Sequence, residues 1–111
     1  MTDHTHRVIV RGRFDALDDT ARTALLDAAD AHDSTDVFNA RFSADGNLTY
    51  DRRLTGFTLR CEITLPRDAG TGDLRARAEA LLAAALAPFG CGHRDLDIRA
   101  TDMDEIKIRR R

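Results

Sequence analysis

The sequence has no tryptophan, a single tyrosine, a single lysine and no long apolar run. A membrane-spanning helix needs about 20 consecutive apolar residues, so the sequence predicts no membrane partner. The first residues, MTDHTHRV, lack the apolar segment of a signal peptide, and we therefore expect a cytoplasmic protein. Few aromatic side chains are present to stack on nucleobases, which argues against nucleic-acid binding.

The charge is balanced, with 17 basic and 19 acidic residues and a formal net charge of −2. This balance gives no bulk electrostatic reason to expect nucleic acid or an anionic membrane as a partner. The glycine-rich phosphate loops and the HExxH zinc motif do not occur in the sequence. The common nucleotide-dependent enzymes are therefore disfavoured, and we expect neither a cofactor nor a metal.

Cysteine is also scarce. Cys61 and Cys91 are thirty residues apart and form no CxxC motif, so we favour two reduced residues over a disulfide. The 111 residues, of which 42% are hydrophobic, fit one globular domain that covers residues 1–111.

Alternating and helical patterns divide the chain into short elements. Residues 57–65, FTLRCEITL, alternate apolar and polar side chains most regularly, as expected for a strand with one buried face. Asp45-Gly46 is a strong turn signal, and Asp18 or Asp19 can cap the first helix. The predicted strands are 6–14, 37–42, 48–51, 57–65 and 93–100, with a possible short strand at 105–109, and the predicted helices are 17–31 and 74–87.

This order predicts an α+β fold. With one hairpin strand set aside it becomes βαββαβ, the ferredoxin-like sandwich, in which two helices cover one face of an antiparallel sheet. The prediction therefore includes an extra β-hairpin strand at 37–42 and a short C-terminal extension. The other face of the sheet needs a cover, and we expect a homodimer through Ile9, Val37, Phe57 and Ile63.

Three stretches, HRVIVRGRFD, LTYDRRL and ATDMDEIKIRRR, carry a family resemblance. Together they resemble a family of short uncharacterised proteins, common in actinobacteria and defined as a domain of unknown function. The resemblance covers nearly the whole chain and implies a shared fold, but no activity. The plan is more distantly similar to the dimeric α/β-barrel proteins, which include small monooxygenases and polyketide cyclases, and this analogy concerns the fold alone.

The stretch LTYDRRL offers the first candidate site. In a strand, Tyr50 and Arg52 face the same side, where a phenol beside a guanidinium can hold an anionic or enolic oxygen. The structural alternative is a tyrosine at the sheet edge with a surface arginine beside it.

Histidines and acids supply the candidate proton carriers. His93 borders a strand and is the best placed of the four histidines, and Cys91 two residues earlier can meet it as a metal or nucleophile pair. We interpret Cys91 and His93 as loop residues, and His4-Thr5-His6 as an adventitious pair that precedes the first strand. Asp102 is the second candidate proton carrier.

The C-terminal charges have simpler interpretations. Asp102, Asp104 and Glu105 offer oxygen ligands, but too few for a calcium loop, so we favour a capped turn over a metal site. Three arginines at 109–111 without a basic surface elsewhere are typical of a solvated tail.

These residues lead to two functional hypotheses. The first is a small-molecule-binding or cofactor-independent proton-transfer enzyme of the cyclase or isomerase type, from bacterial specialised metabolism. Tyr50, His93 and Asp102 would be catalytic, Arg52 would bind the ligand, and the apolar lining would come from Phe38, Phe42, Phe57 and Leu59. The alternative is a non-enzymatic ligand-sensing or protein-interaction module that uses the open sheet face.

Overall fold

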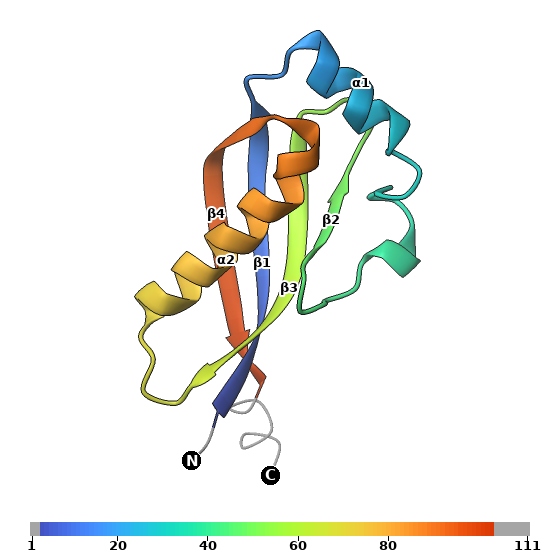
Figure 1. The fold of residues 1–111 in the computed structure, drawn as a ribbon. Helices are drawn as coiled ribbons and strands as arrows, with labels where there is room; N and C mark the ends of the chain where they lie inside the picture. Colours follow the sequence, from blue (N-terminus) through green and yellow to red (C-terminus); the bar gives the residue numbers. More distant parts are fainter. Residues whose placement is uncertain (1–2, 104–111) are drawn as a thin grey trace.

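The computed structural model describes residues 3–103 and shows an α+β fold built on one four-stranded antiparallel sheet. The strands lie in the order β2-β3-β1-β4. The elements in chain order are β1 (Asp3–Asp15), α1 (Asp19–Asp27), the 3-10 helix η1 (Val37–Asn39), β2 (Asn47–Tyr50), β3 (Gly56–Pro66), α2 (Thr71–Leu86), the 3-10 helix η2 (Ala87–Phe89) and β4 (Gly92–Asp102). Helix α2 crosses one face of the sheet, and α1 lies beyond one end of it (Figure 1).

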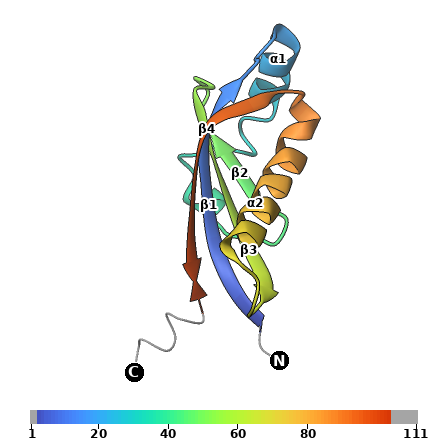
Figure 2. The same cartoon turned by 90° about the vertical axis from the view of Figure 1, so that its left-hand side faces the viewer.

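The central strands form because their sequences alternate. Val8 and Val10 of β1 are fully buried and lie opposite Cys61 and Leu59 of β3. The intervening arginines project from the other face, which α2 leaves open (Figure 2). The predicted strands at 6–14 and 57–65 are confirmed, and both extend beyond their predicted bounds, β1 as far back as Asp3.

The core lies between this sheet and α2. The helix buries Ala78, Leu82 and Leu86, which are spaced four residues apart and so form one stripe along it. It begins at Thr71, three residues before the predicted start, because the Asp73 carboxylate accepts a hydrogen bond from the Gly70 amide at 3.2 Å and so satisfies a backbone donor where the helix begins.

Helix α1 is shorter than predicted. Its cap is Asp18, whose carboxylate accepts a hydrogen bond from the Ala21 amide at 2.8 Å, and this resolves the choice between Asp18 and Asp19. The helix ends at Asp27, and residues 28–32 form turns instead of the further helical turn that the apolar spacing predicted.

The predicted extra hairpin strand at 37–42 is wrong. Asp36 accepts a hydrogen bond from the Phe38 amide at 2.9 Å, and Asp33 accepts two from Thr35 at 2.7 and 2.9 Å. These side chains satisfy backbone groups locally, so the segment turns instead of pairing with a strand. Between Val37 and Gly46 only an isolated bridge from Ser43 reaches β3.

Strand β4 carries a bulge and ends at Asp102. Asp95 has a positive φ of 56°, and the pairing with β1 shifts between Arg11 and Arg13. From Asp97 onward the pairing is regular and places Asp102 directly opposite His6. Both cysteines are free, as predicted.

No helix in the described part of the chain is long and apolar enough to cross a membrane. The predicted strand at 105–109, the acids Asp104 and Glu105, and the arginines at 109–111 lie outside the described residues.

The predicted dimer face is wrong in part, because its four residues do not share one surface. Phe57 and Ile63 point toward α2 and are buried in the core. Ile9 lies on the open face among arginines, and Val37 is exposed in η1. The alternation of β3 located its apolar face correctly, but that face is the one that α2 covers.

Candidate functional site

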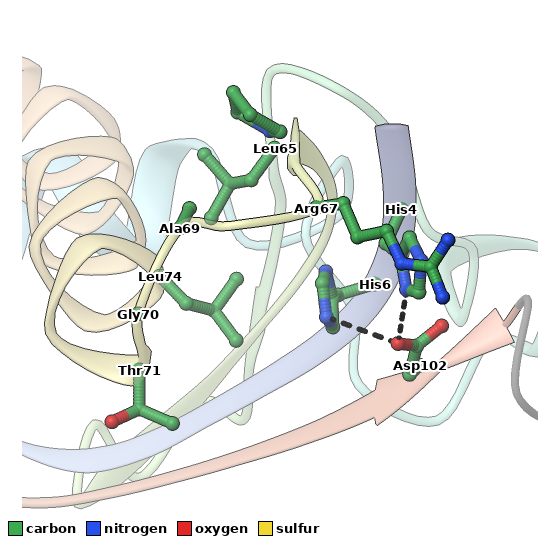
Figure 3. Close-up of a pocket in the computed structure, with 10 residues that line it drawn as sticks. His4, His6, Leu65, Arg67, Ala69, Gly70, Thr71, Leu74 and Asp102 are labelled. Atoms are coloured by element: carbon green, nitrogen blue, oxygen red, sulfur yellow. Dashed lines mark hydrogen bonds and ion pairs between the residues drawn. The ribbon is translucent and has the colours of Figure 1, made fainter. Parts of the chain in front are cut away.

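Three ionisable side chains from the two ends of the chain meet at one end of the sheet. His4 and His6 are two residues apart in β1 and therefore face the same side, the side of α2. The antiparallel pairing of β4 with β1 brings Asp102 opposite His6. Asp102 Oδ2 lies 2.7 Å from His4 Nδ1 and 3.7 Å from His6 Nε2 (Figure 3).

These side chains line a cavity of about 270 Å³ between the sheet and the beginning of α2. We call it the His4–Asp102 pocket. Leu65 and Leu74 supply apolar surface, while Arg67 and Thr71 supply polar groups. The lining residues are His4, His6, Leu65, Pro66, Arg67, Ala69, Gly70, Thr71, Leu74 and Asp102.

The carboxylate of Asp102 fixes the orientation of His4. An ionised carboxylate can only accept, so the 2.7 Å contact requires a proton on Nδ1 of His4. Nε2 is then the nitrogen that can accept or deliver a proton. Both side chains are about one quarter exposed, at 24% for His4 and 21% for Asp102, so solutes can reach them.

His6 presents a different situation. Its Nε2 faces Asp102 at 3.7 Å, which is too long for a hydrogen bond. Its Nδ1 is buried and has no hydrogen-bond partner within residues 3–103. A buried nitrogen without a partner is uncommon in folded proteins and calls for an explanation.

A family model matches residues 1–111 over the whole chain, and its description is a family of unknown function, DUF6204. The chain belongs to DUF6204. This match confirms the resemblance to an uncharacterised family. That resemblance was seen at the two ends of the chain and in the stretch around Tyr50. Comparison with curated proteins and comparison with solved structures give no match.

The sequence predicted one member of the His4–Asp102 pocket and did not predict two others, His4 and His6. Asp102 was a predicted proton carrier and lies in the pocket. His4 and His6 were interpreted as adventitious because the first strand was expected to begin at residue 6, whereas β1 begins at Asp3. The signal was the His-x-His spacing, but only the β1–β4 register shows that a carboxylate lies opposite.

Tyr50 lies elsewhere, in the core, and its exposed fraction is 2%. Its hydroxyl donates a hydrogen bond to the Leu25 carbonyl at 2.6 Å, and its ring stacks on His32. Burial raises the pKa of Tyr50 to about 12. Its catalytic role stays a prediction, and its hydroxyl is engaged in holding α1 to the sheet.

The expected pairing of Tyr50 with Arg52 is wrong. Strand β2 ends at Tyr50, so Arg52 lies in the following turn, where it forms an ion pair with Asp30. The two side chains therefore do not share a strand face.

His93 is exposed near the start of β4, and Asp102 is the last residue of that strand. The structure therefore does not bring the two together, and a catalytic role for His93 stays a prediction. Burial raises the pKa of the neighbouring Cys91 thiol, the opposite of what activates a nucleophilic cysteine.

The expected apolar cavity is wrong as well. Phe57 and Leu59 are buried in the core, but Phe38 is 77% exposed in η1. Phe42 lies under the Arg7 guanidinium, 5.2 Å from ring centroid to Cζ. The four residues therefore line no common cavity.

A metal centre finds no support in the described residues. Between residues 3 and 103, no group of three or more histidine, cysteine, aspartate or glutamate side chains is arranged to hold a metal ion.

Proposed function

We propose that this member of DUF6204 binds a small molecule in the His4–Asp102 pocket and moves a proton on it. The observation that carries the proposal is the contact of 2.7 Å between His4 Nδ1 and Asp102 Oδ2 at the wall of a cavity of about 270 Å³. A carboxylate that orients an imidazole is a recurrent arrangement for general acid–base catalysis.

Each residue has a defined role in this proposal. Asp102 holds the proton of His4 on Nδ1 and stabilises the imidazolium that forms during the reaction. Nε2 of His4 takes a proton from the substrate and returns it at another atom, so the substrate is isomerised or cyclised without change of composition. Proton transfer by an imidazole requires no cofactor. A role in bacterial specialised metabolism would fit a cyclase or isomerase.

The test is a ligand screen followed by paired variants. A small-molecule library is screened by NMR against the full chain, and hits are expected to shift the ring signals of His4 and His6. With a turned-over hit, Asp102→Asn should lower the rate about 10²- to 10⁴-fold, because the amide no longer orients His4 or stabilises its charge.

Asp97→Asn is the matched control. Asp97 is in the same strand but is exposed and pairs with Arg99 at 3.0 Å, so its variant should keep the rate. If His93→Gln abolished turnover and Asp102→Asn did not, the proposal would fail and the predicted role of His93 would take its place.

We also propose that the fold is a variant of the ferredoxin-like plan. The support is the element order β1-α1-β2-β3-α2-β4 within residues 3–103. Helix α1 has nine residues and lies beyond the end of the sheet (Figure 1), in contrast to the full cover by two helices that the sequence predicted. A homodimer and a cytoplasmic location stay predictions, and light scattering would measure the former.

A second candidate function is an interaction module on the open sheet face. The face carries Arg7, Arg11 and Arg13 of β1, together with Arg60 of β3 and Arg94 and Arg99 of β4. Glu62 and Asp97 lie among them and pair with Arg7 and Arg99. Because these acids interrupt the arginines, the expectation of no nucleic-acid partner is kept, and an acidic protein segment is the partner that this charge favours.

A further inference from the structure

Arg67 is a cation at the His4–Asp102 pocket that has no acidic partner within residues 3–103. It lies in the loop between β3 and α2 and lines the cavity. Within the described part of the chain no carboxylate is within ion-pair distance of its guanidinium, whereas Arg75 a short distance along the chain pairs with Glu79 at 3.2 Å. Figure 3 shows its side chain extending along the side of the pocket that holds His4.

His6 adds a buried group that lacks a partner. Its Nε2 faces the Asp102 carboxylate at 3.7 Å. Nδ1 of the same ring is buried and unpaired within residues 3–103. Because Nδ1 is closed to solvent, a ligand in the cavity can reach other atoms of this ring, which lines the cavity, but not Nδ1.

The beginning of α2 completes the wall. The residue before the helix is Gly70, which has no side chain to accept hydrogen bonds from the first-turn amides. A Cβ placed on Gly70 would meet no atom nearer than 4.0 Å, so this position is open to a ligand. The positive end of a helix of 16 residues and the hydroxyl of Thr71 therefore border the same cavity as Arg67.

We propose that the ligand of this pocket carries an oxyanion, a carboxylate or a phosphate, held between Arg67 and the beginning of α2 and beside the His6 ring. This inference rests on the proposed function and names its class of substrate. Leu65 and Leu74 face the apolar part of the ligand. The one carboxylate in the wall, Asp102, bonds His4 at 2.7 Å, so its charge is directed toward that imidazole.

The test uses three probes of nearly equal shape: benzoate, phenyl phosphate and benzamide. Each is titrated into the full chain, and the amide signals of residues 65–74 and the ring signals of His6 are followed by NMR. Benzoate or phenyl phosphate should bind about tenfold more tightly than neutral benzamide, because charge-assisted hydrogen bonds to an anion are stronger than neutral ones. The stronger of the two anions identifies the ligand as a carboxylate or a phosphate.

Arg67→Ala should weaken the preferred anion about tenfold and leave benzamide unchanged. Arg77→Ala is the matched control, because Arg77 is an exposed arginine of α2 that does not line this cavity.

Three outcomes would overturn the inference. Equal affinity for benzoate, phenyl phosphate and benzamide would contradict the inference that the ligand carries an oxyanion, but it would not contradict the proposed proton transfer. Equal effects of Arg67→Ala and Arg77→Ala would show that only net charge matters. Failure of both anions to bind, while a neutral compound from the library screen shifts His4 and His6, would reject the anionic class and keep the site.

Discussion

Tyr50 is the residue whose chemistry depends most on its surroundings. Its ring packs edge-on against Phe14, with 5.6 Å between centroids, and its hydroxyl donates to a main-chain oxygen of α1. By residue type it was the strongest candidate for an acid, and by environment it is a link between sheet and helix. Burial determines this difference, and burial depends on α1 and η2 packing over β2, which a local sequence pattern does not contain.

Tyr50→Phe should destabilise the fold by about 1–2 kcal/mol at neutral pH, because the buried Leu25 carbonyl loses its donor. The raised pKa also has a pH signature. The folded state favours the neutral phenol, so this contribution is complete below the ordinary pKa of 10.0 and is lost as pH rises through about 12.

Urea unfolding at neutral pH and at intervals through that alkaline window measures both effects. The wild type should lose more stability with rising pH than the variant, and since the chain has one tyrosine, the difference between the two curves belongs to Tyr50. Parallel curves would contradict the burial argument. Ligand binding in the His4–Asp102 pocket should be unaffected.

At the scale of elements, sequence periodicity predicted the strands and helices whose structure depends on one segment of the chain. It did not predict the features that depend on two distant segments. Strand β3 was predicted from the alternation of its apolar residues, and helix α2 from apolar residues that recur on one side of the helix. Both patterns arise because each element buries one face against the core. The turn at 33–39 was missed because its apolar alternation resembles a strand while Asp33 and Asp36 bond the backbone locally. The pocket depends on register, since 96 residues separate His6 from Asp102 and only the pairing of β1 with β4 joins them.

Where β4 forms a bulge against β1, close packing around Gly12 leaves no space for a side chain. A Cβ at this position would lie 2.7 Å from Leu96 Cδ2 and 2.8 Å from Phe57 Cζ. Gly12→Ala should therefore destabilise the protein by about 1–3 kcal/mol through overpacking. Urea unfolding measures the change in free energy.

Gly72→Ala is the control for this prediction. Gly72 lies in the first turn of α2, and a Cβ there meets no atom within 4 Å. Alanine favours the helix relative to glycine, so this variant should be neutral or slightly stabilising. Equal losses in the free energy of unfolding at the two positions would show that crowding around Gly12 does not cause the loss.

At the scale of the whole molecule, charge is distributed unevenly, and the open face of the sheet carries more basic than acidic side chains. The formal net charge is −2, yet six arginines lie on the open side of the sheet, at positions 7, 11, 13, 60, 94 and 99. Among the acids on this side, Glu62 and Asp97 form ion pairs with Arg7 and Arg99. Two copies of such a face would repel each other, so a homodimer, if it forms, should use a different surface from the one that the sequence suggested.

Removal of three of these arginines tests the open face as an interaction surface. Arg11, Arg13 and Arg60 form no ion pair within residues 3–103, so no carboxylate there neutralises their charge, although Arg60 donates a hydrogen bond to the Thr49 hydroxyl at 3.4 Å. A labelled short polyglutamate peptide should bind the wild type, measured by fluorescence anisotropy. Binding should weaken strongly between about 50 mM and about 500 mM salt, because exposed charges are screened.

The triple variant Arg11→Ala, Arg13→Ala and Arg60→Ala should weaken this binding at least about tenfold at low salt and flatten its salt dependence. The control replaces Arg22, Arg53 and Arg77, which are exposed on other surfaces and likewise lack ion pairs in the described chain, so the net charge changes equally. If both triple variants lost the same affinity, the peptide would be responding to net charge, and the open face would have no claim to a partner. If only the first lost it, the arrangement of arginines along β1 and β3 would be what the peptide recognises.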